Sequence, residues 1–489
     1  MKKIAEIVRH TSVVAMHGDP ERVVGGLTYD SRNVRPGDCF FAIRGTQSDG
    51  HDYIPMAVEK GAAAVVCEQL PAEPAEEVVY VVVPDSAGAM ADLAAAFYGF
   101  PSRELKLVGI TGTNGKTTTV TLLYDLVRAL GYRAGLISTV VYKVDGREIE
   151  ATHTTPDPIR LNAMMREMAD AGCEFCFMEC SSHAIVQERI RGLDFAGGIF
   201  SNITHDHLDY HKTFAEYIRA KKRFFDGLPK GAFALTNADD RNGMVMVQNT
   251  AAAVSTYSLR GMADFRCKII EMHVDGMLLR IDGQELWTGL LGRFNAYNLV
   301  AVYGAAVLLG LDRGEVLRVL STLHPVSGRF EIVRAANGTV AVVDYAHTPD
   351  ALENVLRTIE EIRTPAQQLI VVCGCGGDRD RTKRPEMAAI AVKYASTAIF
   401  TSDNPRHESP EAILDEMVAG LQPGTRYVRI TDRAEAIRTA VLLSRPGDIL
   451  LVAGKGHETY QILGDVKHHF DDREEVRKAF ELLPKENGH

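Results

Sequence analysis

The eleven residues Val108 to Thr118, Val-Gly-Ile-Thr-Gly-Thr-Asn-Gly-Lys-Thr-Thr, decide the fold of the central part of this chain. An apolar strand that includes Leu107 and Ile110 runs into a glycine-rich turn, and a helix with apolar residues on one side begins at Lys116. The N–H groups of such a turn, with those of the first helical turn, form a concave site for the phosphates of a nucleotide. The stretch therefore predicts a nucleotide-binding α/β domain.

The side chains of this turn have the chemistry that ATP or GTP binding requires. Lys116 supplies a positive charge for phosphoryl transfer, and Thr117 supplies a hydroxyl that can hold Mg²⁺. The usual pattern has a glycine five residues before Gly115, where this chain has Ile110. An ordinary strand–turn–helix junction is the alternative, but Gly-Lys-Thr between a strand and a helix favours a phosphate site. The predicted phosphate contacts are Gly112, Thr113, Asn114, Gly115, Lys116, Thr117 and Thr118.

The composition is that of a globular protein with several domains. Its 489 residues exceed one ordinary hydrophobic core. A formal net charge of -10 argues against nucleic-acid binding, although a few arginines can still bind an anion locally. The cysteines are scattered, and Cys173 and Cys176 lie in an apolar segment, so we expect reduced core cysteines in a cytoplasmic protein. The first residues lack a signal-peptide pattern and the longest apolar run, Leu299 to Leu311, is too short for a membrane span, so we expect no membrane insertion.

Three blocks of residues, 1–101, 102–327 and 328–489, differ in pattern and predict three domains. The first holds short strands and two helices and ends at Gly99-Phe100-Pro101, a natural break. The second begins with the phosphate strand and alternates strand and helix as far as Ser327-Gly328. The third alternates regularly over five strands. We predict an α/β fold with a small N-terminal α/β domain, a central P-loop ATPase-type mostly parallel sheet, and a C-terminal Rossmann-like open sheet.

Motifs that follow the turn occur in the order seen in Mur ligases, which add amino acids to UDP-muramoyl peptides. The matching segments are Thr111 to Thr117, Met178 to His183, Asn202 to His211, Gly292 to Asn298, Ser327 to Phe330 and Asp344 to Pro349. The chain resembles this family over essentially its full length. The resemblance implies an ATP-dependent, ADP-forming acid–amino-acid ligase, a cytoplasmic monomer that works in the synthesis of peptidoglycan precursors.

The resemblance also assigns catalytic and magnesium-binding residues. Amide synthesis from a carboxylate needs an activated acyl group, which in an ATP-dependent ligase of this type is an acyl phosphate. Phosphoryl transfer between anions needs positive charge and metal. Glu179 ends an apolar strand and is expected to hold Mg²⁺ with Thr117, and by resemblance with His207. Lys221 lies on the apolar face of a predicted helix over Thr213 to Phe225, where a lysine usually only extends to solvent. The aligned lysine of Mur ligases is carbamylated and helps to hold magnesium, so we expect that role for Lys221.

The remaining contacts follow from the same resemblance. Those expected for the nucleotide are Asn295, Asn298, Arg329 and Asp344. Those expected for UDP, in the first block, are Tyr29, Ser31, Thr46, Gln47 and Ser48. Those expected for the muramoyl peptide are His153, Thr154, Thr155, Ser181, Gln187 and Arg189. The family members compared have asparagine where this chain has His153.

The sequence Ser-Asp-Asn-Pro-Arg at Ser402 to Arg406 follows a predicted strand of the third block, where ligands of such sheets lie. Arg406 can bind a carboxylate with two N–H groups. meso-2,6-Diaminopimelate has a distal carboxylate that lysine lacks, so a buried guanidinium would discriminate against lysine. The expected amino-acid contacts are Arg379, Asp403, Asn404, Pro405, Arg406, Gly454 and Glu458. We therefore expect meso-2,6-diaminopimelate to be added to the D-glutamate γ-carboxyl of UDP-N-acetylmuramoyl-L-alanyl-D-glutamate.

Three other functions stay open at this point. Lysine-adding Mur ligases carry a different tetrapeptide without the arginine. A folylpolyglutamate synthase-like ligase shares the central architecture but lacks such a first domain and the Asp-Asn-Pro-Arg turn. A P-loop ATPase or nucleotide switch, from another functional class, would leave the charged groups of the third block unexplained.

Overall fold

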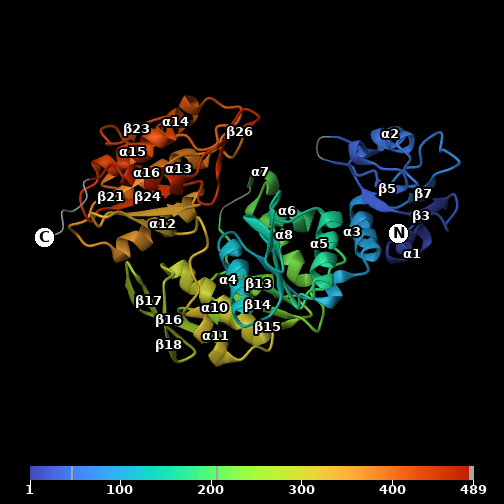
Figure 1. Ribbon diagram of the computed structural model, residues 1–489, viewed down its shortest axis with the longest axis horizontal. Helices are drawn as coiled ribbons and strands as arrows, with labels where there is room; N and C mark the ends of the chain where they lie inside the picture. The colour runs from blue at the N-terminus through green and yellow to red at the C-terminus, as the bar shows by residue number, and fades with distance from the viewer. Residues whose placement is uncertain (46–47, 205–207, 484–489) are drawn as a thin grey trace.

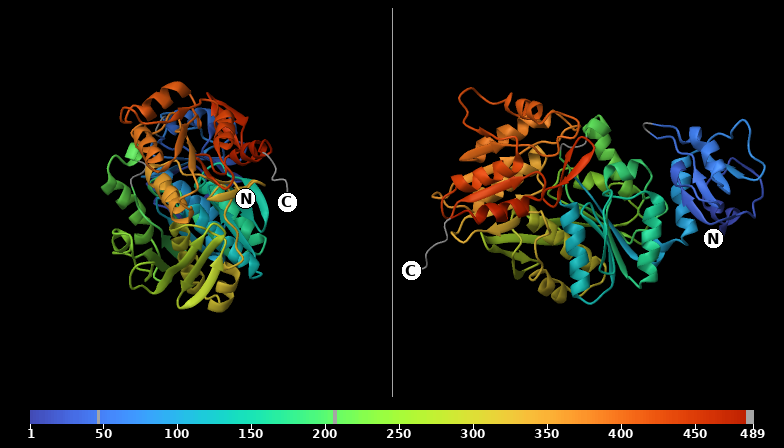
Figure 2. Two further views of the ribbon diagram at one scale, coloured as in Figure 1. Left: turned by 90° about the vertical axis from the view of Figure 1, so that its left-hand side faces the viewer. Right: turned by 45° about the horizontal axis from the view of Figure 1, so that its top comes forward.

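The computed structural model describes residues 1–45, 48–204 and 208–483. Three α/β bodies follow one another along the long axis, with the N-terminal body at one end and the C-terminal body at the other (Figure 1). The right-hand view of Figure 2 shows the same order, with the central body between the other two. The strands of their main sheets fall within residues 15–82, 106–288 and 331–453. The predicted α/β class with three domains is confirmed.

The N-terminal body contains a five-stranded sheet in the order β2-β7-β6-β5-β4 and a small β1–β3 pair. Its strands are β1 (Lys2–Lys3), β2 (Ala15–His17), β3 (Val23–Val24), β4 (Gly26–Thr28), β5 (Asp38–Phe41), β6 (Ala64–Cys67) and β7 (Val79–Val82). Its α-helices are α1 (Ile4–Ile7), α2 (Ile54–Glu59) and α3 (Ser86–Phe97). Helix α3 lies nearest the central body, where Asp92 pairs with Arg191 at 2.9 Å.

The central body contains eleven strands in one sheet, ordered β11-β10-β9-β12-β8-β13-β14-β15-β16-β17-β18. These are β8 (Lys106–Thr111), β9 (Ala134–Ile137), β10 (Val141–Val144), β11 (Arg147–Glu150), β12 (Phe175–Glu179), β13 (Gly197–Phe200), β14 (Phe233–Asn237), β15 (Ala253–Ser258), β16 (Phe265–His273), β17 (Gly276–Ile281) and β18 (Gln284–Thr288). The helices are α4 (Lys116–Ala129), α5 (Pro158–Asp170), α6 (Ser182–Val186), α7 (Leu208–His211), α8 (Phe214–Asp226), α9 (Gly243–Met246), α10 (Arg293–Leu308) and α11 (Arg313–Leu320).

Alternation of side chains along β8 explains why helices cover both faces of the central sheet. Val108 and Ile110 pack in one hydrophobic cluster with residues of α4 and α10, and Leu107 packs in another with residues of α5 and α8. A strand buried on both faces has a continuous apolar sequence, as this one does. The predicted strand, turn and helix are confirmed, and helix α4 begins at Lys116.

The predicted alternation of strand and helix up to Ser327 is wrong for two parts of the central body. Strands β10 and β11 form an antiparallel hairpin, and β15 to β18 follow one another without a helix. The turns Asp145-Gly146 and Asp282-Gly283 have positive φ at both residues, which suits tight hairpins. These Asp-Gly pairs were the available sequence signal, and they favour hairpins over crossover helices.

The C-terminal body is a six-stranded sheet in the order β19-β20-β24-β21-β22-β23, parallel except for β19, with a separate β25–β26 hairpin. Its strands are β19 (Glu331–Arg334), β20 (Val340–Asp344), β21 (Leu369–Cys373), β22 (Thr397–Phe400), β23 (Val428–Arg429), β24 (Ile449–Ala453), β25 (Tyr460–Leu463) and β26 (Val466–His469). Its helices are α12 (Pro349–Ile362), α13 (Lys383–Tyr394), α14 (Pro410–Val418), α15 (Arg433–Leu443) and α16 (Asp472–Phe480). Leu369 and Val371 pack in the cluster of α12, α13 and α14, whereas Ile370 and Val372 pack in that of α15 and α16.

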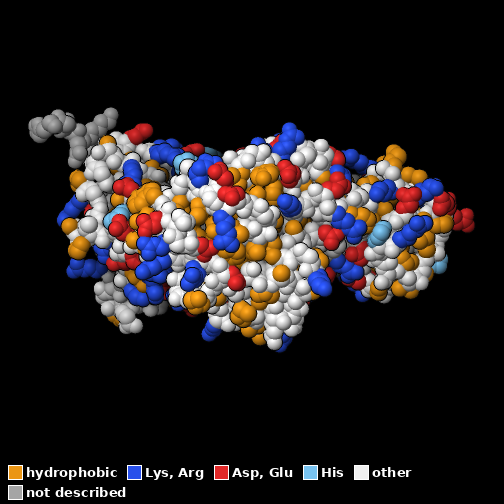
Figure 3. Space-filling model, turned by 90° about the horizontal axis from the view of Figure 1, so that it is seen from below, with side chains coloured by type: hydrophobic (Ala, Val, Ile, Leu, Met, Phe, Trp, Pro, Cys, Tyr) orange, Lys and Arg blue, Asp and Glu red, His pale blue; other side chains and the backbone are white. Residues whose placement is uncertain are grey.

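The cysteines lie in the core, and charged side chains of both signs are spread over the face shown in Figure 3. All eight cysteines are free and buried. Within the described residues, no helix is long and apolar enough to cross a membrane. Acidic and basic side chains are interspersed over the face seen in Figure 3, rather than gathered by sign.

Candidate active site between the central and C-terminal sheets

A cleft of about 1070 Å³ is lined by residues that follow strands of both the central and the C-terminal sheet. In the central sheet, parallel register places Glu179 beside Ile110, directly before the glycine-rich turn. In the C-terminal sheet, Asp344 and Cys373 both stand opposite Ala453, so their strands end at one edge. Loops at such carboxyl edges are where open α/β sheets bind ligands.

The glycine-rich turn has the shape of an anion site. Gly115 caps α4 with φ +86° and no side-chain cap, and the first N–H groups of a helix have no partner within it. A Cβ on Gly115 would lie 2.5 Å from Asn298 Oδ1, so a larger residue there would displace the Asn298 side chain. Lys116 Nζ donates to Gly112 O at 3.0 Å and to Thr113 O at 2.8 Å. Backbone donors and an ammonium group thus surround one small volume.

Glu179 and Thr117 form the candidate magnesium site. Glu179 is buried, and its Oε1 accepts from Thr117 Oγ1 at 2.9 Å and from the Thr139 N–H at 2.7 Å. Arg329 Nη2 donates to the same Thr117 hydroxyl at 3.3 Å. Carboxylate and hydroxyl oxygens side by side are suitable ligands for Mg²⁺. The other expected protein ligand, His207, lies outside the described residues.

Lys221 is buried on the inner face of α8, where only 1% of its surface is exposed. Its Nζ donates to Gly112 O at 2.8 Å and lies 4.6 Å from the centre of the Tyr217 ring. Lys116 donates to the same carbonyl, so two lysines meet at the phosphate turn. Because Lys221 lies on the buried, largely apolar face of α8, its side chain enters the site instead of solvent.

The residues expected to grip the muramoyl peptide are joined to Glu179. Thr155 Oγ1 donates to the Glu179 carbonyl at 2.7 Å, and Arg189 Nη1 donates to Thr155 O at 2.7 Å. Arg189 also binds Gln187 Oε1, at 2.7 Å through Nη2. The cleft wall includes all six residues of the set, namely His153, Thr154, Thr155, Ser181, Gln187 and Arg189.

The expected UDP contacts lie in the N-terminal body, away from the cleft wall. Ser31 is buried and Ser48 is exposed, while Thr46 and Gln47 lie outside the described residues. Burial raises the pKa of the Tyr29 phenol, with a further rise from the charge of Asp157 and a smaller opposing effect of Arg189. Asp157 and Arg189 both belong to the central body, and Arg189 is one of the expected muramoyl-peptide contacts.

Of the four expected nucleotide contacts, three line the cleft and one lies behind its wall. Asn298 lines the cleft, whereas Asn295 lies behind it and accepts from Asn298 Nδ2 at 3.1 Å. Asp344 lines the cleft and accepts the N–H groups of Phe330 and Ala346, each at 2.7 Å. Burial raises the pKa of Asp344, and the positive charge of Arg329 opposes that rise.

Arg329 joins the two bodies. Its guanidinium lies 4.4 Å from the centre of the Tyr345 ring and donates to Thr117 across the cleft. Its Nε is buried without a hydrogen-bond partner among the described residues. A buried donor that lacks a partner in the protein is the kind of group that a bound anion can satisfy.

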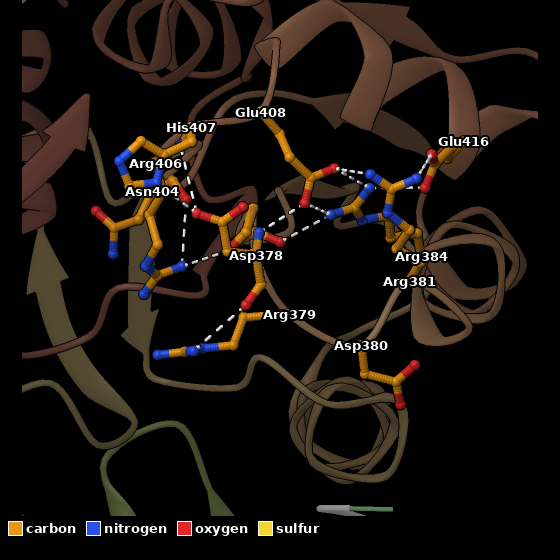
Figure 4. Close-up of polar contacts among 12 residues, drawn as sticks. Asp378, Arg379, Asp380, Arg381, Arg384, Asn404, Arg406, His407, Glu408 and Glu416 are labelled. Carbon is orange, nitrogen blue, oxygen red and sulfur yellow. Dashed lines mark hydrogen bonds and ion pairs between the residues drawn. The ribbon is translucent and has the colours of Figure 1, made fainter. Parts of the chain in front are cut away.

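On the C-terminal side of the cleft, two neighbouring loops each carry an arginine. Arg406 Nη1 donates to Gly377 O at 2.8 Å, and Arg379 follows two residues later in the same loop as Gly377. Their guanidinium groups lie on one side of the cluster drawn in Figure 4. Both residues line the cleft, as do Asp403, Asn404, Gly454 and Glu458, whereas Pro405 does not belong to its wall.

Lys455, which follows the expected contact Gly454 and to which the sequence analysis gave no role, contacts the acidic residues of this part of the cleft. It is fully buried, and its Nζ donates to Asn404 Oδ1 at 3.0 Å and Glu458 Oε2 at 3.1 Å. Asn404 Nδ2 donates to the same Glu458 oxygen at 2.8 Å. Burial and the charge of Asp403 raise the pKa of Glu458, which Lys455 opposes.

Asp350, in the first turn of α12, was missed by the sequence analysis. Its Oδ2 accepts from Asn114 Nδ2 at 2.8 Å, Thr204 Oγ1 at 3.3 Å and Asn354 Nδ2 at 3.2 Å. The C-terminal body thereby contacts the phosphate turn directly. An acidic residue in a first helical turn is common, so the sequence carried no separate signal for this contact.

Comparison with known proteins adds family matches to this geometry. Residues 23–98 match the Mur ligase family, catalytic domain; residues 110–306 match the Mur ligase middle domain; and residues 328–456 match the Mur ligase, glutamate ligase domain. The three matched ranges together cover most of the chain.

Curated relatives and a solved structure match over nearly the whole length. The chain is 54% identical over 480 residues to the UDP-N-acetylmuramoyl-L-alanyl-D-glutamate–2,6-diaminopimelate ligase of Phocaeicola vulgatus, covering 98% of this chain and 99% of the relative. It is 56% identical over 459 residues to the protein of the same name from Parabacteroides distasonis, covering 94% of each. A solved structure of a UDP-N-acetylmuramoyl-L-alanyl-D-glutamate–2,6-diaminopimelate ligase superposes with a TM-score of 0.70 at 33% identity, over 98% of this chain and 99% of that one.

Proposed function

The chain belongs to the Mur ligase family, and we propose that it adds meso-2,6-diaminopimelate to the D-glutamate γ-carboxyl of UDP-N-acetylmuramoyl-L-alanyl-D-glutamate, with ATP as phosphoryl donor. One observation carries the proposal. The phosphate turn with Lys116 and the turn with Arg406 line the same cleft, so a phosphorylated acceptor and an amino acid can meet there. Such a reaction contributes to peptidoglycan precursor synthesis.

The phosphate end suits activation of the acceptor carboxylate. A carboxylate oxygen of the acceptor attacks the γ-phosphorus of ATP, the bond to ADP breaks, and an acyl phosphate forms. Lys116 and the N–H groups of the turn stabilise the charge on the transferred phosphoryl group. Thr117 and Glu179 would hold Mg²⁺, which supplies further positive charge there. Arg329, whose Nε is buried without a partner in the described chain, would complete the anion site.

The opposite end suits the amino acid. The Arg406 and Arg379 guanidinium groups bind carboxylate, and Glu458 and Asp403 offer negative charge to an ammonium group. The free amine attacks the acyl carbon, a tetrahedral intermediate forms, and inorganic phosphate leaves with the proton of the amine transferred to solvent or to a neighbouring base. Lysine would leave the arginines without a distal carboxylate, which favours diaminopimelate.

Carbamylation of Lys221 is part of the proposal. The ammonium group of Lys221 first loses a proton. The neutral amine then attacks CO₂, a nitrogen–carbon bond forms and a second proton leaves, so the cation becomes an anion. The two lysines that donate to Gly112 O would then become an oppositely charged pair, and the new carboxylate would line the same cleft as Thr117 and Glu179 of the candidate magnesium site. Labelled bicarbonate should give a carbamate carbon signal that Lys221→Arg lacks. An identical spectrum for both proteins would remove this role.

Phosphate release from ATP tests the reaction. We expect release only when both the UDP-muramoyl dipeptide and diaminopimelate are present, and much weaker turnover when lysine replaces diaminopimelate. Equal turnover without either acceptor would indicate an ATPase or a nucleotide switch and would refute the ligase proposal. Efficient use of lysine would refute only the proposed choice of amino acid.

A further inference from the structure

We propose that Arg384 and Glu408 are positioning residues for amino-acid selection, because together they hold the two loops that carry Arg379 and Arg406 in a fixed relation. This inference rests on the proposed function, since it concerns how the distal carboxylate of the amino acid is recognised. Neither residue lines the cleft, so each acts through the residues that do.

The two loops are in direct backbone contact. Residues 374–379 follow β21 and residues 401–408 follow β22. The Gly377 N–H donates to Asn404 O at 2.9 Å, and Arg406 Nη1 returns to Gly377 O at 2.8 Å. A Cβ on Gly377 would lie only 1.9 Å from Pro405 O, so no larger residue fits between the loops. A shift of either loop would therefore move Arg406 relative to Arg379.

Arg384 and Glu408 tie both loops to helix α13. Arg384 donates to both oxygens of Glu408, from Nη1 to Oε2 at 3.0 Å and from Nη2 to Oε1 at 2.9 Å. Its Nη2 also donates to Gly376 O in the first loop at 3.2 Å. Glu408 Oε1 in turn accepts from the Asp378 N–H at 2.6 Å. The pair thus connects the two loops. Arg384 and Glu408 both contact the backbone of residues 374–379, and Glu408 itself ends the loop of residues 401–408.

Electrostatics makes this pair strong. The Arg384 side chain is fully buried, and that of Glu408 is 14% exposed. The hydrogen bonds from Arg384 lower the pKa of Glu408 from 4.5 to about 2, so the carboxylate keeps its charge in mildly acidic solution as well as at neutral pH. Neutralising Glu408 leaves Arg384 paired with Glu416, at 2.6 Å. It removes the charge that Arg384 contacts with two N–H groups and that accepts the Asp378 N–H, so the loops would move to compensate.

The backbone of the arginine turn needs such support. Arg406 and Asp378 both have φ +52°, in the left-handed region that residues other than glycine rarely adopt. The Arg406 N–H donates to Ile462 O of β25, which holds the turn from one side. The Arg384–Glu408 pair holds it from the other side, and Figure 4 shows Arg384 and Glu416 across the cluster from the guanidinium groups of Arg379 and Arg406.

The test compares Glu408→Gln with Glu416→Gln in the full-length protein. Glu416 also accepts from Arg384, at 2.6 Å, but comes from α14 and is 37% exposed. We expect Glu408→Gln to raise the KM for diaminopimelate about tenfold, because loops displaced by a fraction of an ångström misplace both arginines. The KM values for ATP and for the UDP-muramoyl dipeptide should stay within about twofold of wild type, by the same reasoning. Glu416→Gln should resemble wild type in every one of these constants.

Arg384→Lys is a second variant, and it tests the positioning role even if Glu408→Gln does not fold. Lysine keeps the charge but cannot bind both carboxylate oxygens in a fixed plane, so we expect a smaller rise in the KM for diaminopimelate. Both variants should also lower the preference for diaminopimelate over lysine. A role in stability alone would not change that preference.

The possible outcomes distinguish a wrong choice of amino acid from a wrong positioning role for Arg384 and Glu408. A wild-type enzyme that uses lysine as well as diaminopimelate refutes the substrate proposal and the positioning role with it. A selective wild type, together with a Glu408→Gln variant that matches Glu416→Gln in KM and preference, refutes the positioning role alone. An equal rise in all three KM values would also refute it, because the effect would then be general.

Discussion

Replacing Gly377 by alanine tests whether the contact between the two arginine-bearing loops sets catalysis. The added Cβ would lie 1.9 Å from Pro405 O and 2.7 Å from Pro405 C, both of them backbone atoms. Because a Cβ is essentially never found within 3.0 Å of another heavy atom, the loops must separate by about 1 Å. That displacement would pull Gly377 O away from Arg406 and the Gly377 N–H away from Asn404.

The expected magnitude follows from the displacement. A misplacement of about 1 Å costs on the order of 100-fold in rate, so kcat/KM for diaminopimelate should fall by about that factor. Overpacking should lower the free energy of unfolding by about 1–3 kcal/mol. The KM for ATP should be unchanged, because the phosphate turn belongs to the central sheet and not to the two displaced loops.

The assay is phosphate release at varied diaminopimelate, with urea unfolding of the same preparations. Gly231→Ala is the matched control, because a Cβ at Gly231 meets nothing within 4 Å. If Gly377→Ala and Gly231→Ala give the same kcat/KM and the same unfolding midpoint, the loops are not held in the contact described. The reasoning about Arg406 would then be refuted.

Three further predictions concern other parts of the molecule. Lys116→Met should lower kcat by about 1000-fold with an unchanged melting temperature, because it removes charge from the phosphate turn; a variant with normal turnover would contradict the role of this turn. Asp350→Asn should raise the KM for ATP about fivefold, because it weakens the contact with Asn114, and an unchanged KM would exclude an effect of this contact on nucleotide binding. Burial, with help from Arg329, lowers the pKa of His457 from 6.5 to about 3, so folding stability should fall as the pH drops below 6.5 towards 3. At pH 5 the loss relative to pH 7.5 should be about 2 kcal/mol and absent in His457→Gln, and equal urea midpoints for both proteins at pH 5 and pH 7.5 would contradict it.

Local sequence predicted a large part of the fold because its signals act over a few residues. Glycine-rich turn chemistry and apolar runs located β8, α4 and the five main strands of the C-terminal sheet. The 3.6-residue period placed Lys221 on the buried face of α8. The same kind of signal was present but unused at Asp145-Gly146 and Asp282-Gly283, where hairpins replaced the predicted alternation.

Candidate site residues were found where a motif lay next to a strand end. Glu179 and Arg406 line the cleft, as their positions at or after strand ends suggested, and so does Arg329, which was expected from the resemblance alone. The resemblance could not separate Asn298, which lines the cleft, from Asn295, which supports it, because both lie on one face of the same helix. The sequence analysis gave Lys455 no role, because a lysine between two glycines is most often a surface residue.

By itself the sequence determined the three α/β units, the anion-binding turn and the identity of the charged side chains, because these depend on residue type and short spacing. Only the tertiary structure decided which of those charges meet. Asp350 contacts Asn114 across 236 positions of chain, and Arg384 finds Glu408 across 24. Such contacts depend on how bodies and loops pack, and a buried charge is stable only beside the partner that this packing brings to it.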